Sequence, residues 1–230
     1  MLDWLDPDSR PEFPPTAQAL EHPNGLLAAG GRVSPLWLDA AYRRGIFPWN
    51  DPQEVRLWWS PAPRAIITAE QFRLSRTIRK LLRRQPYFIT ANQAFEQVQA
   101  ACAEPRDAEG GTWIDDELLL HYPRLHAAGR AISVEAWNDG ALVGGWYGVL
   151  IGSALFGESM FSRASNASKL AFATAAPILL DAGVTLIDCQ MQTEHLAQFG
   201  CMEVERAEFE DRLRSAIQHP TPTPLPCVLS

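Results

Sequence analysis

Apolar and polar positions alternate along this chain in a way that predicts an α+β protein. The clearest signal is a hairpin, in which the runs ISVEAW and ALVGGWYGVL flank the turn Asn138-Asp139-Gly140. A third strand, ALFGE, follows after a short turn. The apolar spacing then predicts a helix from Asn166 to Gly183, the buried strand TLIDCQ, the short helix TEHLAQFG and the strand CMEVE. This order is three antiparallel strands followed by helix–strand–helix–strand.

The N-terminal quarter of the chain has a different character. Residues 1–22 are acidic and rich in proline, without periodicity, so we expect an extended arm. Ser34 is a suitable N-cap for a short helix at Pro35–Arg44, followed by the loop GIFPWNDP and the short strand VRLWWS. The prolines around residue 62 indicate a domain boundary. We therefore predict a small N-terminal α+β domain, residues 1–62, and a larger domain, residues 63–230.

The remaining elements lie between these two regions and at the C-terminus. The pattern predicts strands at 64–68 and 87–90, a basic helix capped by Ser75, helices at 92–103 and 115–128 on either side of the loop GGTWID, and a helix at 206–217 before a Pro-rich tail. Pro123 is expected to disturb its helix.

Composition limits the class of protein. The chain has 230 residues, of which 47% are hydrophobic, enough for a sizeable core. No apolar run is long enough to span a membrane, and the N-terminus has acids and prolines where a signal peptide needs a basic start and an apolar stretch. We expect a cytoplasmic monomer.

The four cysteines give no metal signature. Cys102, Cys189, Cys201 and Cys227 lack CxxC spacing, which is typical of small buried side chains in a reducing compartment. A zinc site would need Cys189, His195 and Cys201 to converge, and their spacing matches no known zinc motif. We expect no metal.

Charge is distributed unevenly. The net charge of −7 argues against a general nucleic-acid-binding protein. One short segment nevertheless gathers six cations without interspersed acids, while apolar residues recur there at helical spacing. Spacing alone leaves open a solvated charged face and a phosphate-binding surface. The six residues, called the basic segment below, are Arg73, Arg76, Arg79, Lys80, Arg83 and Arg84.

Three polar residues at strand ends are candidates for catalysis. Glu158 ends an apolar strand, where its charge is disfavoured unless a cation arrives; an internal pair with Arg163 or Lys169 is the alternative. Asp188 and Gln190 are two residues apart, so a regular strand places them on one face. The carboxylate could then orient the amide toward an incoming amine, or both groups could simply bond neighbouring backbone.

Aromatic and apolar residues suggest a binding pocket. Trp49 and Trp113 lie in predicted loops, where an indole can stack on an unpaired base or anchor the loop to the core. A second set could line an apolar pocket or form ordinary core. It consists of Trp146, Leu155, Phe156, Met160 and Phe172.

A set of short motifs in a fixed order resembles one protein family. The motifs, from about Pro23 to Gly200, are GLLAAGG, AYRRGIFPW, WWSP, GTWI, VGGWYG, GESMFS, NASK and LIDCQ. Together they resemble the leucyl/phenylalanyl-tRNA–protein transferases. The resemblance implies a catalytic domain with the fold of GCN5-related N-acyltransferases: a mixed, mostly antiparallel sheet flanked by helices.

The resemblance also implies an activity. Members transfer Leu or Phe, with Met as a further candidate, from aminoacyl-tRNA to the N-terminal α-amine of proteins that begin with Arg or Lys. This forms a peptide bond without a cofactor and marks the protein for N-degron proteolysis.

The resemblance assigns roles to the candidates above. Asp188 would hold Gln190, Gln190 would orient or help to deprotonate the amine, and Glu158 would meet positive charge on the acceptor. Trp49 and Trp113 would hold the terminal adenosine, and the apolar set would hold the aminoacyl side chain. The basic segment would grip the acceptor stem of Leu-tRNA or Phe-tRNA.

The chain departs from the family pattern at three places. Trp146 stands where a smaller Met or Leu is expected and should shrink the pocket. Arg32 stands where an acid is expected, and HLAQFG replaces a turn of smaller residues.

Two other functions compete with this one. An acetyl-CoA-dependent N-acetyltransferase of the same fold would need a phosphate-binding turn, and the corresponding segment, SRASNAS, has no glycine. A tRNA-binding module without catalysis leaves Glu158, Asp188 and Gln190 without a role.

Overall fold

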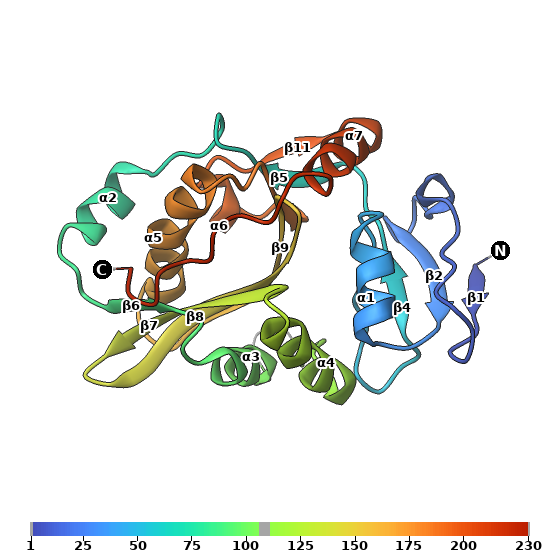
Figure 1. Cartoon of the computed structure of the whole chain (residues 1–230), viewed down its shortest axis with the longest axis horizontal. Coiled ribbons are helices and arrows are strands. Elements are labelled where there is room, and N and C mark those ends of the chain that lie inside the picture. Colours follow the sequence, from blue (N-terminus) through green and yellow to red (C-terminus); the bar gives the residue numbers. More distant parts are fainter. Residues whose placement is uncertain (1, 106–110, 230) are drawn as a thin grey trace.

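Two β-sheets lie side by side along the molecule, the smaller one built from the N-terminal part of the chain (Figure 1). The structure is a computed structural model that describes residues 2–105 and 111–229. Within these residues, no helix is long and apolar enough to cross a membrane.

The smaller sheet has the strand order β1-β2-β4-β3. Its strands are β1 (Asp3–Leu5), β2 (Leu26–Gly30), β3 (Phe47–Pro48) and β4 (Leu57–Trp59), with helix α1 (Pro35–Tyr42) packed beside them. Phe13, Trp37 and Trp58 form the centre of its core through ring contacts. The Ser34 side chain caps α1 by accepting from the Trp37 N–H, as its position predicts.

The extended arm expected at residues 1–22 is packed onto the smaller sheet where the structure describes it, from residue 2 onward. Residues of β1 pair in parallel with β2, and Phe13 is buried against two tryptophans. A short 3-10 helix follows at Thr16–Gln18. Burial of Leu5 and Phe13 holds this segment on the sheet, a tertiary effect that local sequence patterns do not reveal.

The larger sheet has the order β11-β5-β10-β9-β8-β7-β6. Its strands are β5 (Arg64–Ile67), β6 (Phe88–Ala91), β7 (Ala131–Asn138), β8 (Ala141–Ile151), β9 (Ala154–Ser162), β10 (Leu186–Gln190) and β11 (Met202–Val204). Among these strands, β9 and β10 are parallel and every other neighbouring pair is antiparallel. The predicted α+β class with a mixed, mostly antiparallel sheet is confirmed, as is the Asn138-Asp139-Gly140 hairpin.

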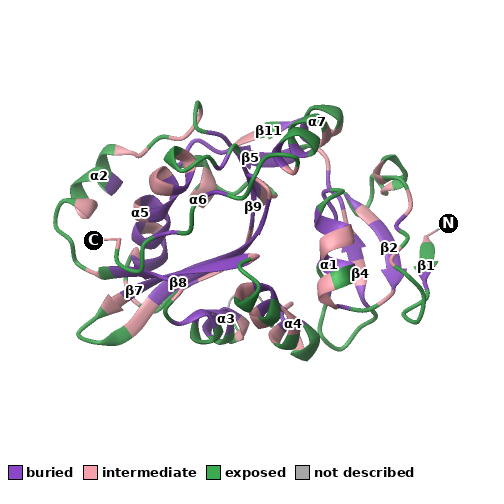
Figure 2. Cartoon of the chain, in the orientation of Figure 1, coloured by how far each residue is buried: buried purple, intermediate pink, exposed green. Residues whose placement is uncertain are grey.

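Helices cover both faces of this sheet (Figure 1). They are α2 (Arg76–Leu82), α3 (Phe95–Ala103), α4 (Asp116–Ala127), α5 (Ala167–Asp181), α6 (Glu194–Ala197) and α7 (Arg206–Ala216). One core cluster joins α3, α4 and α7 to the sheet, and a second joins α2 and α5 to its other face. The strand segments between the two layers are accordingly buried, as Figure 2 shows for much of β8.

Glycine explains how α5 approaches the sheet. A Cβ at Gly144 on β8 would lie 2.5 Å from the Ala167 Cβ at the start of α5. Only glycine therefore permits this contact without moving the helix. The close approach fixes the position of the β9–α5 turn.

The strand pair β9–β10 opens partway along its length. The last paired residues are Asp188 and Phe156, whereas β9 continues to Ser162. On the other side of β10, the register with β5 shifts between Asp188 and Gln190, and Gln190 has φ of 58°. The regular alternation that would place Asp188 and Gln190 on one face is therefore wrong, because a bulge lies between them.

Two helices differ from their predicted form. The helix expected from Asn92 begins at Phe95, since Asn92 has φ of 58° and its side chain bonds the Ser133 N–H. Helix α4 continues through Pro123 because Leu118, Tyr122 and Leu125 pack into the core. Gly110 of the predicted GGTWID loop lies outside the described residues.

The predicted boundary at residues 62 and 63 falls between the two sheets, after β4 and before β5. The division into two domains, residues 1–62 and 63–230, stays a prediction.

Candidate active site

A cavity of about 820 Å³ occupies the place where β9 and β10 diverge. Its walls come from both parts of the chain. They include the segments Phe47–Trp49 and Gly111–Trp113, strands β8 and β9, the end of β10, and residues of α3, α5 and α6. Glu158 and Gln190 line it together with most of the predicted aromatic residues. The opening of one parallel strand pair thus creates the site.

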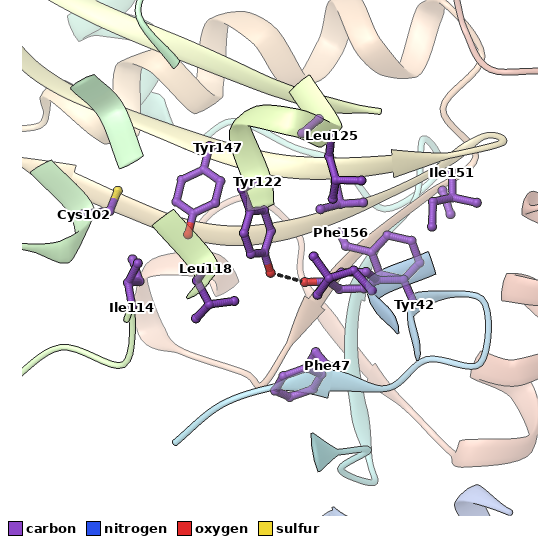
Figure 3. Packing of buried hydrophobic residues seen from close by; sticks show 14 of the residues in the cluster. Tyr42, Phe47, Cys102, Ile114, Leu118, Tyr122, Leu125, Tyr147, Ile151 and Phe156 are labelled. Carbon is purple, nitrogen blue, oxygen red and sulfur yellow. Dashed lines mark hydrogen bonds between the residues drawn. The ribbon is translucent and has the colours of Figure 1, made fainter. Parts of the chain in front are cut away.

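Glu158 on β9 is a carboxylate that lines this cavity. Its Oε1 accepts a hydrogen bond from the Tyr42 hydroxyl at 2.7 Å, and its Oε2 accepts one from the Tyr122 hydroxyl at 2.9 Å. The two hydroxyl oxygens are 2.5 Å apart, the contact drawn as a dashed line in Figure 3. The alternative, an internal pair with Arg163 or Lys169, is not formed: Arg163 pairs with Glu104, and the described contacts give Lys169 no ion pair with Glu158.

The surroundings of Glu158 shift its acidity toward neutrality. Burial raises its pKa from 4.5 to about 7, while the two tyrosine hydrogen bonds oppose that rise. The charge of Asp188 raises the pKa slightly further, and that of Arg64 lowers it. A carboxyl group with such a pKa can accept or release a proton near physiological pH.

Asp188 is buried and fully engaged. Arg64 donates to its two oxygens, from Nε at 2.8 Å and from Nη2 at 2.7 Å. Its Oδ1 also accepts the backbone N–H of Gln190 at 2.9 Å. Asp188 therefore holds the main chain of Gln190 and does not contact its side-chain amide, which corrects the geometry expected from the sequence.

Arg64 is enclosed as completely as its partner. Its guanidinium lies over the rings of Phe47 and Phe209, with its central carbon 5.0 Å and 4.5 Å from the two ring centres. This buried pair fixes the end of β10 against β5. The Gln190 side-chain amide lines the cavity and has no hydrogen-bond partner within the part of the chain that the structure describes.

The predicted aromatic and apolar pocket residues divide into three groups. Trp49 and Trp113 line the cavity, and Trp49 is 39% exposed at its edge. Trp146, Leu155, Met160 and Phe172 also line it. Phe156 does not: it lies on the opposite face of β9 and packs against Tyr42, with ring centres 4.9 Å apart (Figure 3).

The basic segment lies on the surface, on and around α2, which packs against α5. All six of its cations are exposed, and the described contacts include no ion pair for any of them. On the inner face of α2, Ile78 is buried in the core cluster that includes α5. The Arg73 N–H donates to the carbonyl of Phe199, two residues after α6 ends, so the start of the segment lies near the helix that lines the cavity.

The sequence did not point to Tyr42, Tyr122 or Arg64 as site residues. In the sequence, Tyr42 and Tyr122 occupy positions on the apolar faces of their helices, which predicts core packing. Their hydrogen bonds to Glu158 in the structure show that they also have a polar role. Arg64 begins an apolar strand, and a cation there is unusual enough to have suggested a buried partner. No group of three or more His, Cys, Asp or Glu side chains suitable for a metal occurs among residues 2–105 and 111–229.

Comparisons with known proteins give a consistent result. A family model described as "Leucyl/phenylalanyl-tRNA protein transferase" matches residues 66–214, and one described as its N-terminal domain matches residues 31–62. A curated relative of the same description from Aromatoleum aromaticum is 54% identical over 209 residues, covering 91% of this chain and 87% of that protein. Another from Chromobacterium violaceum is 50% identical over 222 residues, covering 96% and 94%.

Proposed function

The chain belongs to the leucyl/phenylalanyl-tRNA–protein transferase family, and we propose that the cavity between β9 and β10 is where it joins the donor amino acid to the acceptor protein. The observation that supports this most directly is the meeting of Glu158, Gln190 and two tryptophans, Trp49 and Trp113, in one cavity.

The reaction is aminolysis of an ester. The α-amine of the acceptor attacks the carbonyl carbon of the aminoacyl ester, the carbon–oxygen bond to the terminal ribose breaks, and the ribose oxygen takes up a proton. Because the ester is already activated, correct placement of the two reactants supplies much of the rate.

Glu158 acts as the proton acceptor in this proposal. An N-terminal amine arrives largely as ammonium, with a pKa of about 7.7–8.0. The carboxyl pKa of about 7 is close enough for the proton to move from the amine to Glu158 at little free-energy difference. The other candidate, Asp188, is excluded from this role because Arg64 bonds both of its oxygens inside the core.

Gln190 orients the amine, and Asp188 orients Gln190. The amide oxygen of Gln190, which lines the same cavity as Glu158, can accept a hydrogen bond from the attacking amine. Asp188 acts through the main chain: its bond to the Gln190 N–H holds the bulge that turns this residue toward the cavity. Asp188 is thus a positioning residue.

The donor is held at two places. Trp49 and Trp113 at the cavity edge offer aromatic faces for the terminal adenosine, and stacking on one base contributes about 1–3 kcal/mol. From there the acceptor stem can follow α6 to the basic segment, whose unpaired cations suit phosphate contacts without reading sequence. The acceptor class, proteins beginning with Arg or Lys, follows from the family resemblance.

The test uses purified protein, one tRNA charged with radiolabelled Leu or Phe, and two peptides that differ only in an N-terminal Arg or Ala. We expect label on the Arg peptide alone. Equal labelling of both peptides would contradict the acceptor class, and no labelling of either by intact charged tRNA would contradict the transferase function itself.

A further inference from the structure

The wall of the cavity nearest α5 is closed. It is built from Trp146 on β8, Leu155 on β9 and Phe172 on α5, which line the cavity yet are only 2%, 0% and 5% exposed. The ring of Trp146 packs edge-on against Phe172, with ring centres 5.7 Å apart. Because these three side chains are almost fully buried, the cavity does not extend past them toward α5.

The rest of the cavity around this wall is more accessible. Met160, which pairs with Trp146 across the β8–β9 ladder, is partly exposed, as are Cys189 and Leu196. Met191 at the edge is more exposed still. An amino acid bound here therefore meets flexible, unbranched sulfur-containing side chains and one leucine in front of a sealed indole wall.

Packing alone holds the indole in place. The Trp146 Nε1–H is buried without a hydrogen-bond partner among the described residues. A substitution by Met therefore removes volume from the wall without breaking a hydrogen bond, which makes Trp146 a clean position for testing the size of the pocket.

We propose that Trp146 determines donor specificity by filling the inner end of the aminoacyl pocket, so that this enzyme selects the flexible aliphatic side chains of Leu and Met over the phenyl ring of Phe. This inference rests on the proposed function of the cavity. A flexible side chain can lie along Met160 and Leu196, whereas a rigid ring needs depth that the indole occupies. Differences of this size in an apolar pocket change kcat/KM by about 10–200-fold.

The experiment compares donors that differ only in the amino acid. One tRNA transcript is acylated with Leu, Met or Phe, and kcat/KM for transfer to the Arg peptide is measured for the wild-type protein and for Trp146→Met. We expect the wild type to prefer Leu and Met over Phe by about tenfold or more, and Trp146→Met to raise the Phe-to-Leu ratio by about the same factor.

Two further variants keep the result interpretable. Trp146→Phe retains an aromatic wall of smaller size and should give an intermediate ratio. Trp137→Met removes a half-buried indole from β7, outside the cavity lining, and should leave the ratio unchanged. A wild type that uses Phe as well as Leu, or a ratio that Trp146→Met and Trp146→Phe do not change, would overturn the inference alone. Failure of all three donors would overturn the proposed function with it.

Discussion

Glu158, the proton acceptor of our proposal, is a carboxylate whose pKa depends on its burial. Burial disfavours its charged form, so its pKa in the folded protein, about 7, lies above the ordinary value of 4.5. The folded state consequently binds this proton more tightly than the unfolded state, and stability falls as the pH rises from about 4.5 through 7.

Glu158→Gln removes this titration while keeping the shape of the side chain. We expect the variant to be more stable than the wild type at pH 8, by on the order of 1–3 kcal/mol, with a smaller difference at pH 5. Urea unfolding at the two pH values measures this. Glu104→Gln, at an exposed carboxylate of the cavity edge, is the control and should show little change at either pH. The account would be refuted if the stability of Glu158→Gln relative to wild type were lower at pH 8 than at pH 5.

The Arg64–Asp188 pair presents a different electrostatic case. Both side chains are fully buried, so removing one partner leaves an uncompensated charge in the core. We expect Arg64→Met or Asp188→Leu to destabilise the protein by about 3–5 kcal/mol, and the double variant to lose much less than the sum of the two. Chemical denaturation of the three variants measures the coupling, and strictly additive losses would show that the pair is not a unit.

At the scale of elements, α2 and the residues around it expose cations on the surface, and the described contacts give these cations no ion pair within the protein. Replacing Arg79 and Arg83 by Gln should weaken binding of aminoacyl-tRNA and reduce the dependence of log K on log salt concentration by about 2. The fold should be unaffected, because both side chains are exposed. Filter binding over a range of salt concentrations is the measurement.

Helix α7 supplies the matched control for α2. Arg212 and Arg214 there are also exposed but pair with Glu208 and Asp211. Replacing both by Gln changes the net charge equally, so an equal loss of tRNA affinity would mean that α2 has no special part in binding.

The element scale also shows what local patterns can and cannot predict. The order of strands and helices after residue 130 follows from apolar spacing and turn residues such as Asn138-Asp139-Gly140, and the structure confirms it. The bulge at the end of β10 does not follow, because it arises from the bond between Asp188 and the Gln190 N–H and from the buried Arg64. Neither a register shift nor a partner 124 positions away leaves a signal in a short window.

At the scale of the molecule, the N-terminal part completes the site. Tyr42 on α1 reaches Glu158 on β9, and Trp49 closes one edge of the cavity. The sequence identified Glu158 and Trp49 as candidates but gave no reason to bring Tyr42 to them, because the contact depends on how the two sheets pack. The sequence also could not tell which of the predicted apolar pocket residues line the cavity. The structure shows that Phe156 lies on the other face of β9, against Tyr42.

Tyr42→Phe tests this connection. The Tyr42 hydrogen bond lowers the pKa of Glu158, so its removal should raise that pKa further and leave less of the carboxylate form at neutral pH. We expect slower transfer at pH 7, with much of the loss recovered at pH 8.5. A rate reduced equally at both pH values would indicate a purely structural effect.

The central claim is that Glu158 accepts the amine proton in the cavity between β9 and β10, and one measurement tests it most directly. It is the single-turnover rate of transfer from Leu-tRNA to an Arg peptide as a function of pH, for wild type and Glu158→Gln. We expect the wild-type rate to rise through an inflection near pH 7, and the variant to lose that inflection and to be about 10²–10⁴-fold slower. A variant with the wild-type rate and the same pH profile would contradict the account.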